Sequence, residues 1–365
     1  MAKELDDLVP DIRERMEQAL PDLLAREGLQ AGLVEPWEDG YRTGDRTDAF
    51  EWWYFDCEFD DGSTAVVTFS TKPSTKPKGD LRPTILLILK TPDGEKVRLS
   101  KEFEPGELSA SAGGCDVRIG PSTVKGDLDR YVMHVEADDS AADLTLTRSG
   151  PSWRPGSGFT YSGRNEEKFF AWVVPITYGT VEGTLTFKGK KSEVKGTCYH
   201  DHNWGNFALT SGLDHWYWGR AHVGDFTVVF VEMVTPHLPF VGSLNLHTLM
   251  LARDEEVLTD DGLPLRLRVD DFVDGPLGGS YPTKLDWSWK SEEGEIALTI
   301  RNPRLIESLD VLEGSPRWER FLVHLFSNPY YYDFNADLEL RVDLKDVKAV
   351  EKGQALYELM HLQQK

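Results

Sequence analysis

The sequence is poor in cysteine, in long apolar runs and in positive charge. Its three cysteines, Cys57, Cys115 and Cys198, are too few and too scattered for a disulfide framework or a zinc cage, which favours a reducing compartment. The longest strongly apolar run, Ile85–Leu89, is far too short to span a membrane as a helix. Lys and Arg number 40 against 62 Asp and Glu, a net charge of −22, which argues against nucleic acid or an anionic membrane as partner.

Several functional signatures are also missing. The chain carries no glycine fingerprint for phosphate binding, no nucleophile elbow and no repeat of fixed period, so we expect no cofactor. Residues 1–30 contain charges throughout and lack the apolar segment and small-residue cleavage site of a secretory signal. These absences predict a cytoplasmic protein without stable membrane insertion.

Aromatic residues are abundant, with 11 Trp, 12 Tyr and 17 Phe. Tryptophan combines a large apolar surface with one N–H group, so it is common in the walls of pockets for bulky apolar ligands as well as in protein cores. The composition therefore favours a hydrophobic small molecule as the partner.

Hydrophobic spacing predicts a mainly β chain with a helix at each end. Leucines and other apolar residues recur every three or four positions within residues 1–30, and Gly353–Gln363 has a similar pattern. Between these segments, short alternating runs separated by turn residues indicate antiparallel strands. The length suggests about two domains. We expect a helical segment over 1–30, a first β domain over 31–195 and a second over 196–365.

The segment 196–206 contains two histidines, His200 and His202, that fall on one face of a strand. They could bind a metal together with His215 or His222, brace a structural hydrogen-bond network, or place one imidazole for proton transfer. No glutamate follows at a ligand-like spacing, so we predict no metal site and assign a catalytic role to His202.

Two glutamates in apolar strands are candidate catalytic acids. Glu232 alternates with Val228 and Phe230, so it is either a buried acid with a raised pKa or a structural partner of Arg220 or a histidine. Glu51 shares a strand face with Trp53 and invites the same two interpretations.

Further aromatic residues are either core or pocket wall. Trp216 and Trp218 share one face of a predicted strand, and Tyr331 is the middle of three consecutive tyrosines. The predicted substrate-binding residues are Trp53, Tyr54, Trp204, Trp216, Trp218, Phe230 and Tyr331.

The motifs Glu51-Trp52-Trp53-Tyr54-Phe55, His200-Asp201-His202-Asn203-Trp204-Gly205 and Trp216-Tyr217-Trp218-Gly219, in this order, resemble the carotenoid 1,2-hydratase/AttH-like lipocalin-fold family. That family is related to lipocalin-like cyclases that catalyse intramolecular Diels–Alder reactions. The resemblance implies two lipocalin-like antiparallel β domains in tandem, with a hydrophobic pocket inside one or between them. Together with the helices predicted from spacing, the expected fold is all-β, with two tandem barrels or sandwiches and short N- and C-terminal helices.

The resemblance also implies site residues. Hydratases of this type are thought to protonate an alkene and capture the cation with water, and their His and Trp correspond to His202 and Trp204. A Tyr-x-Asp of the family corresponds to Phe230-Val231-Glu232 here, so an acid is kept and a phenol is lost.

We therefore predict a cofactor-independent cyclase or isomerase of the Diels–Alderase type, acting on a polyene, polyketide or terpenoid substrate. A pericyclic ring closure requires a shaped apolar pocket and at most a hydrogen-bond donor. A carotenoid 1,2-hydratase-like enzyme that adds water to an isoprenoid alkene is the first alternative. A non-catalytic carrier of an apolar ligand is the second.

Overall fold

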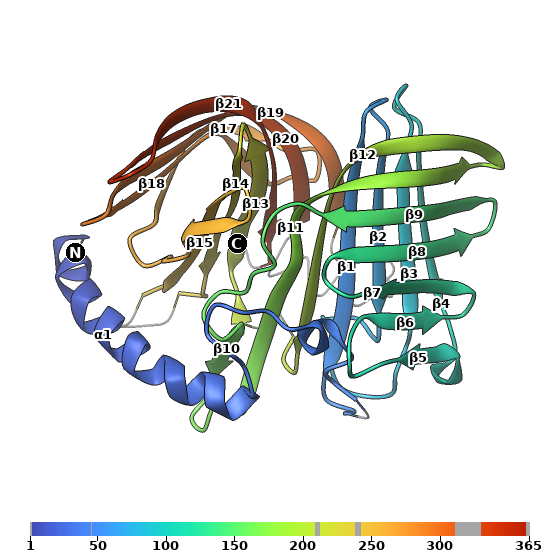
Figure 1. Cartoon of the computed structure of the whole chain (residues 1–365), viewed down its shortest axis with the longest axis horizontal. Coiled ribbons are helices and arrows are strands. Elements are labelled where there is room, and N and C mark those ends of the chain that lie inside the picture. The colour runs from blue at the N-terminus through green and yellow to red at the C-terminus, as the bar shows by residue number, and fades with distance from the viewer. Residues whose placement is uncertain (1, 45, 209–211, 238–241, 311–329, 363–365) are drawn as a thin grey trace. The chain divides into compact units, whose positions relative to one another are not determined.

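The computed structural model describes residues 2–44, 46–208, 212–237, 242–310 and 330–362, and it is built almost entirely from antiparallel strands (Figure 1). The chain divides into two compact units. The N-terminal unit comprises Glu17–Ala208, and the C-terminal unit comprises Leu209–Lys365 together with Met1–Met16. The all-β prediction is confirmed.

The expected N-terminal helix is present as α1, which spans Ala2–Glu27. Within the part of the chain that the structure describes, no helix combines the length and apolar character needed to cross a bilayer.

The N-terminal unit is one twelve-stranded sheet with the order β4-β3-β2-β1-β12-β11-β9-β8-β7-β6-β5, and β10 pairs with β11. Its strands are β1 (Phe50–Phe59), β2 (Thr64–Ser70), β3 (Thr84–Lys90), β4 (Lys96–Glu102), β5 (Leu108–Ala110), β6 (Asp116–Ile119), β7 (Ser122–Gly126), β8 (Arg130–Ala137), β9 (Ser140–Arg148), β10 (Phe159–Ser162), β11 (Lys168–Phe187) and β12 (Lys190–Gly205). Two short 3₁₀ helices, η1 (Pro36–Asp39) and η2 (Pro105–Glu107), complete it.

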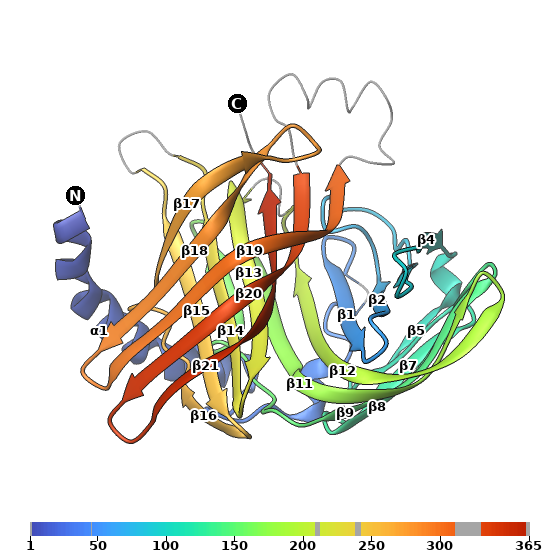
Figure 2. The same ribbon diagram turned by 90° about the horizontal axis from the view of Figure 1, so that it is seen from above.

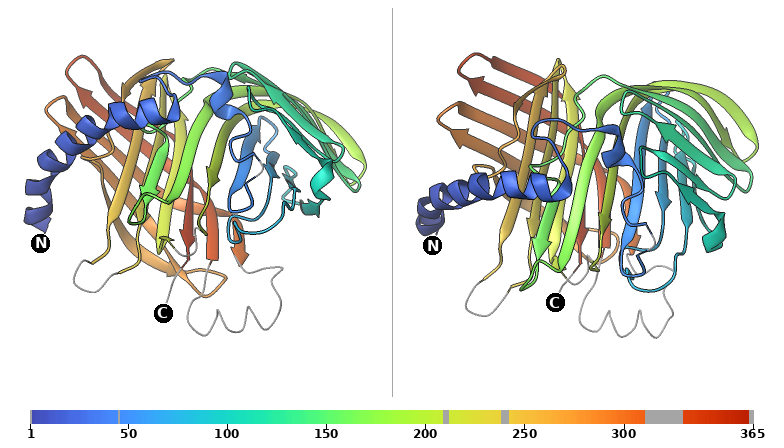
Figure 3. Two further views of the ribbon diagram at one scale, coloured as in Figure 1. Left: turned by 90° about the horizontal axis from the view of Figure 1, so that it is seen from below. Right: turned by 60° about the horizontal axis from the view of Figure 1, so that its bottom comes forward.

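This sheet curves until β5–β9 lie across β1–β4, as Figures 1 and 3 show. The alternation in β3 explains why: Ile85, Leu87 and Leu89 are buried, whereas Leu86 and Ile88 are half-buried. The inward residues of β1–β3 and of β6–β9 form one apolar core.

The C-terminal unit is a nine-stranded antiparallel sheet with the order β16-β15-β14-β13-β21-β20-β19-β18-β17, and its curvature is visible in Figure 2. Its strands are β13 (His215–Val223), β14 (Phe226–Val234), β15 (Asn245–Arg253), β16 (Glu256–Thr259), β17 (Arg266–Asp274), β18 (Ser280–Ser291), β19 (Gly294–Asp310), β20 (Tyr330–Leu344) and β21 (Lys348–His361). A second, separate core forms on one face of this sheet.

The predicted C-terminal helix is wrong. The segment lies mostly in β21, where Ala355, Tyr357 and Leu359 are buried at alternate positions. β21 pairs with β13 on one side and β20 on the other, so sheet hydrogen bonds on both edges prevail over the helix-like spacing of its apolar residues.

The boundary expected between residues 195 and 196 falls within β12. That strand continues to Gly205 because β1 and β11 both pair with it, and the division into units comes after Ala208. The helical segment assigned to residues 1–30 is itself divided, with residues 1–16 grouped in the C-terminal unit.

Candidate active site

Two of the motifs that carry the family resemblance lie side by side in the N-terminal unit. β1 and β12 are antiparallel neighbours, and their register places Glu51 opposite Trp204 and Trp53 opposite His202. The sheet thus joins Glu51 to His202, which are separated by 151 positions in the sequence.

Glu51 is fully buried, and every polar contact of its carboxylate is with a donor. Oε1 accepts from the Arg42 backbone N–H (2.8 Å) and faces Nε2 of His202 (2.8 Å). Oε2 accepts from the backbone N–H (2.8 Å) and the hydroxyl (2.7 Å) of Thr43. A carboxylate surrounded in this way is an acceptor that fixes the His202 ring, and it has no free position from which to protonate a substrate.

His202 is fully buried between two indoles. Its ring stacks on Trp53 with centroids 4.6 Å apart and planes at 13°, and its other neighbour is Trp204, at 4.8 Å and 37°. The rings of Trp53, His202 and Trp204, three of the predicted site residues, therefore pack one after another, and Trp204 is the last of the three.

On the far side of Trp204 lies a cavity of about 410 Å³, within the N-terminal unit. Its walls come from η1, the segment before β10, and strands β10–β12. Six aromatic side chains define what we call the aromatic cavity: Trp37, Phe159, Tyr161, Phe169, Trp172 and Trp204. This volume is within the range of about 300–1,000 Å³ that small-molecule sites occupy.

The polar side of the aromatic cavity centres on Glu38, a buried residue of η1. Its carboxylate contacts Nη1 of Arg154 (3.0 Å) and accepts from the Glu35 backbone N–H (2.8 Å). Burial raises the pKa of Glu38 above its ordinary value, although the hydrogen bond from Glu35 and the charge of Arg154 oppose this. The cavity therefore contains a carboxyl group whose proton is held more tightly than usual.

Arg154 is also buried, and it donates to the carbonyl oxygens of Leu33 and Gln30 at 2.5 Å each. Its Nε–H finds no hydrogen-bond partner among the described residues. An unsatisfied buried donor is unfavourable, and this N–H is enclosed by protein rather than open to the cavity.

Two further arginines of the cavity wall lie over aromatic rings. The guanidinium carbon of Arg42 is 5.0 Å from the centre of the Trp37 ring, and that of Arg46 is 5.3 Å from the Phe169 ring. Charge and aromatic surface are thus combined in one cavity.

Several of these residues were not found from the sequence. Glu38 and Trp37 follow Pro36 in a short turn, and Arg154 is a single cation between Trp153 and Pro155, so none belongs to a periodic pattern or a known motif. Tryptophans were the feature of the sequence that could have pointed to this site. Trp37 and Trp172 line the cavity, and Trp153 packs against Trp172.

The predicted residues of the N-terminal unit take different positions. Trp204 lines the cavity, whereas Glu51, His202 and Trp53 are buried behind it and are not among its described lining residues. Tyr54 is half-buried on the other face of β1, where its ring meets the edge of Tyr199 at 6.4 Å.

The remaining predicted residues belong to the C-terminal unit. Glu232 accepts a hydrogen bond from Asn245 Nδ2 (3.2 Å) and contacts Nε2 of His247 (2.7 Å). A histidine partner is what the structural interpretation of Glu232 expected. Phe230 is fully buried against Trp287, with ring centroids 5.0 Å apart.

The other three are half-buried. Trp216 donates to Glu358 Oε1 (2.9 Å), Trp218 follows it two positions later on β13, and Tyr331 lies on β20.

Comparison with known proteins agrees with the resemblance of the motifs. Residues 116–277 match the model of the Diels-Alderase-like family. The quinolone epoxide rearrangement protein penF of Penicillium thymicola is 39% identical over 68 residues, which are 19% of this chain and 18% of that protein. The hydroxyneurosporene dehydrogenase of Chlorobaculum tepidum is 26% identical over 208 residues, 48% of this chain and 54% of that one. The chain thus aligns with about half or less of the length of these curated relatives.

Solved structures extend the similarity to nearly the whole fold. A putative AttH from Nitrosomonas europaea superimposes with a TM-score of 0.64 at 18% identity, covering 91% of this chain and 98% of that one. CghA bound to Sch210972 gives 0.61 at 15%, covering 87% and 89%. Kievitone hydratase from Nectria haematococca gives 0.57 at 13%, covering 90% and 93%. At these identities the likeness establishes the lipocalin-like fold.

Proposed function

We propose that this chain is a cyclase or isomerase that folds a hydrophobic polyene, polyketide or terpenoid substrate inside the aromatic cavity. The observation that carries this proposal is the composition of the cavity wall, where six aromatic rings face a buried carboxyl group and a buried arginine. The match to the Diels-Alderase-like family over residues 116–277 supports the reaction class.

The apolar part of the reaction needs little besides shape. Ring closure within one flexible chain is slow because reactive conformations are rare, so a cavity that holds the chain folded lowers the entropic part of the barrier. Trp37, Trp172 and Trp204 provide rigid surfaces against which a conjugated chain can stack.

The polar part of the cavity suits a carbonyl-bearing substrate. A hydrogen bond to the carbonyl of an activated alkene draws electron density from the double bond, and this effect grows as charge develops in the transition state. In our proposal the protonated carboxyl of Glu38 donates this bond.

Glu38 also gives a specific reason to keep hydration as the second candidate. A carboxyl group with a raised pKa keeps its proton to higher pH than an ordinary glutamate, and in its protonated form it can protonate an alkene, after which water adds to the cation. Cyclisation and hydration would then differ in whether the bound chain or a water molecule reaches the activated carbon first.

In the same proposal, Glu51 and His202 are positioning residues. They hold the column of rings that ends at Trp204, so they act on the substrate through that indole. Glu232 and His247 form a separate acid–imidazole pair that we retain as a second candidate acid in the C-terminal unit.

The test is product analysis with linear polyene precursors that carry a carbonyl-activated alkene. Cyclisation or isomerisation gives a product of unchanged mass, whereas hydration adds one water and incorporates heavy oxygen from labelled solvent. We expect conversion without mass change, and Glu38→Gln to reduce the rate at least about tenfold. The matched control is Glu95→Gln, an exposed carboxylate of the same unit that pairs with Lys188.

The outcomes separate the alternatives. Loss of activity in Glu232→Gln with full activity in Glu38→Gln would move the acid to the C-terminal unit. Tight binding of polyenes with no conversion of any precursor would establish the carrier instead.

A further inference from the structure

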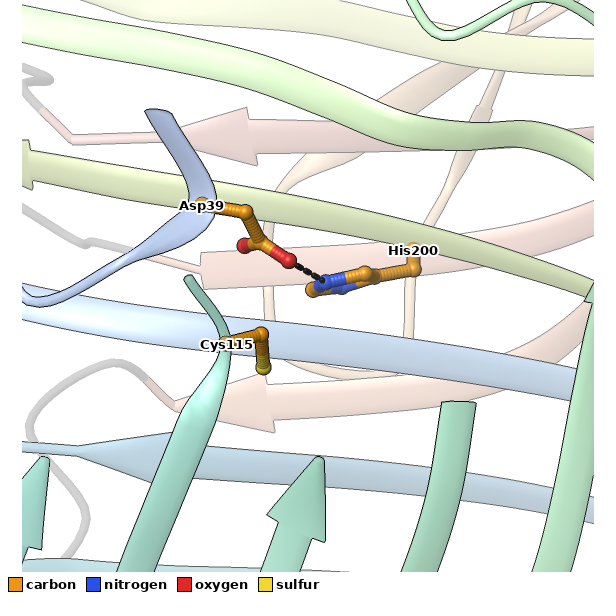
Figure 4. A group of neighbouring side chains, drawn as sticks. All are labelled: Asp39, Cys115 and His200. Atoms are coloured by element: carbon orange, nitrogen blue, oxygen red, sulfur yellow. Dashed lines mark hydrogen bonds and ion pairs between the residues drawn. The ribbon is translucent and has the colours of Figure 1, made fainter. Parts of the chain in front are cut away.

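A second group of reactive side chains lies in the N-terminal unit, away from the aromatic cavity wall. Asp39 at the end of η1, Cys115 just before β6 and His200 on β12 bring their ligand atoms within 4.8 Å of one another (Figure 4). All three are buried, with exposed fractions of 1%, 2% and 0%. The neighbouring Tyr131 donates its hydroxyl to Asp39 Oδ2 at 2.6 Å.

The hydrogen bonds of His200 determine where its lone pair points. Nδ1 is 2.9 Å from the backbone oxygen of Tyr54, and because a carbonyl can only accept, the proton must be on Nδ1. The neutral ring therefore presents the Nε2 lone pair to Asp39 Oδ2, only 3.1 Å away. Two lone pairs at this distance repel each other unless a proton or a metal ion lies between them.

The same conflict occurs on the other side of Asp39. His202 directs Nε2 to Glu51, which places the proton there, and its Nδ1 is 3.4 Å from Asp39 Oδ1. Neither Asp39 Oδ1 nor His202 Nδ1 has a hydrogen-bond partner among the described residues, and both side chains are at least 99% buried. Thus Asp39 faces two imidazole nitrogens, and within the part of the chain that the structure describes, the Tyr131 hydroxyl and the Cys115 thiol are the side-chain donors beside it.

We propose that Asp39, Cys115 and His200 bind a divalent metal ion of zinc type. One thiolate, one carboxylate oxygen and one imidazole nitrogen are all donors that zinc accepts. With bonds of about 2.0–2.3 Å, tetrahedral donors lie about 3.3–3.8 Å apart, so donor atoms that lie within 4.8 Å of one another have to close by at most about 1 Å. The bond from His200 Nδ1 to a backbone carbonyl is the usual outer support of a metal-binding imidazole.

The burial of all the donors assigns a structural role to the ion. A catalytic zinc keeps one position open to substrate, whereas these side chains are enclosed by the core and do not line the aromatic cavity. The ion would connect η1, which carries Glu38, to the turn before β6 and to β12. This inference does not depend on the proposed reaction, because its tests do not measure turnover.

The first test is the metal content of the full-length protein purified from zinc-supplemented cells, measured by plasma mass spectrometry. We expect about one zinc per chain, and at least a tenfold loss of bound zinc in Cys115→Ser and His200→Ala. Cys57→Ser is the matched control for a buried free cysteine, and His134→Ala for a histidine paired with a carboxylate. Both controls are expected to retain the metal.

The second test keeps the proposal falsifiable if the ligand variants fail to fold. Cobalt introduced into wild-type protein should give thiolate-to-cobalt charge-transfer absorption and the d–d bands of a tetrahedral site. Wild-type protein with less than about a tenth of an equivalent of zinc and no such absorption would overturn the proposal. In that case protons alone would resolve the contacts.

Discussion

At the scale of single residues, the main distinction is between side chains that hold the site and side chains that can meet a substrate. Glu51 and His202 belong to the first group because both are fully buried. The Glu51 carboxylate is surrounded by hydrogen-bond donors, and the His202 ring stacks on Trp53. Glu38, Arg154 and Trp204 belong to the second because they line the aromatic cavity. The two groups make different predictions under substitution.

Replacing Glu51 by Gln should destabilise the protein by about 2–4 kcal/mol. The carboxylate accepts from the Thr43 backbone and hydroxyl as well as from Arg42, and an amide NH₂ in its place would face one of these donors. Urea unfolding followed by circular dichroism measures the change. Glu58→Gln, a half-buried position on the same strand, is the control and should cost much less. A loss below about 1 kcal/mol for Glu51→Gln would mean that the surroundings rearrange.

Replacing Trp204 by Ala should affect both stability and binding. Truncating a buried aromatic residue costs about 3–5 kcal/mol, and here it also removes one wall of the aromatic cavity. We expect the Kd for all-trans-retinol, measured by quenching of tryptophan fluorescence, to rise at least about tenfold. Trp287→Ala, in the core of the C-terminal unit, should lower stability by a similar amount without weakening retinol binding. Equal loss of binding in both variants would place the ligand elsewhere.

The residues of the site that could be predicted from the sequence are those on strands, where side chains alternate between the two faces of the sheet. Glu51, Trp53 and His202 stand out because polar and aromatic residues recur within otherwise apolar strands, and the structure brings them together. Whether they reach a cavity could not be predicted, since that depends on what packs in front of them. Glu38 was missed because it lies in a turn, and its burial comes from the distant Arg154, 116 positions away.

At the scale of elements, strand pairing decides conformation where local spacing is ambiguous. The apolar residues of β21 fit a helical stripe as well as an alternating strand, yet both of its neighbours offer open hydrogen-bonding edges. Prediction of strands succeeded where β-branched and other apolar residues are dense and charges are few, as in β14, whose one charged residue is Glu232. Pairing partners that are distant in sequence explain the failure at the C-terminus.

The pairing of β21 with β13 has a consequence for stability at acid pH. His361 faces His215 across this pair, and burial, together with the charge of His215, lowers the pKa of His361 to about 4, although Asp214 opposes the shift. The unfolded chain takes up a proton near pH 6.5 and the folded protein only near 4, so stability should fall as the pH drops from 6.5 to 4. The full effect is roughly 3 kcal/mol.

The measurement is the free energy of unfolding of wild type and His361→Gln across this pH range. The difference between the two should change by most of that amount between neutral pH and pH 4, because glutamine does not titrate. His134→Gln is the control, since His134 is exposed beside Asp143. A difference that is constant with pH would show that His361 is protonated equally in both states.

At the scale of the whole molecule, the average composition conceals how charge is distributed. A net charge of −22 argues against nucleic acid or an anionic membrane as partner, and it does not show that arginines and glutamates gather in the wall of one cavity. The arginines are Arg42, Arg46 and Arg154, and the glutamates are Glu27, Glu38, Glu166 and Glu167. The same holds for the aromatic surplus, which is divided between two separate cores and the cavity. The composition suggests an apolar ligand, which stays a prediction, whereas the location of the cavity required the fold.

The N-terminal unit contains every described element needed for the aromatic cavity. The sheet from β1 to β12, its core, and all the lining residues lie within Glu17–Ala208. A fragment of residues 17–208 should therefore fold alone and bind all-trans-retinol within about threefold of the full chain, since a self-contained core with its own sheet is what independent folding requires. Circular dichroism, thermal unfolding and the fluorescence titration test this expectation.

Trp204→Ala in the fragment should weaken binding as it does in the full chain, which locates the ligand in the same cavity. A folded fragment that no longer binds retinol would show that the C-terminal unit completes the site, and an unfolded fragment would show that the two units are one cooperative structure.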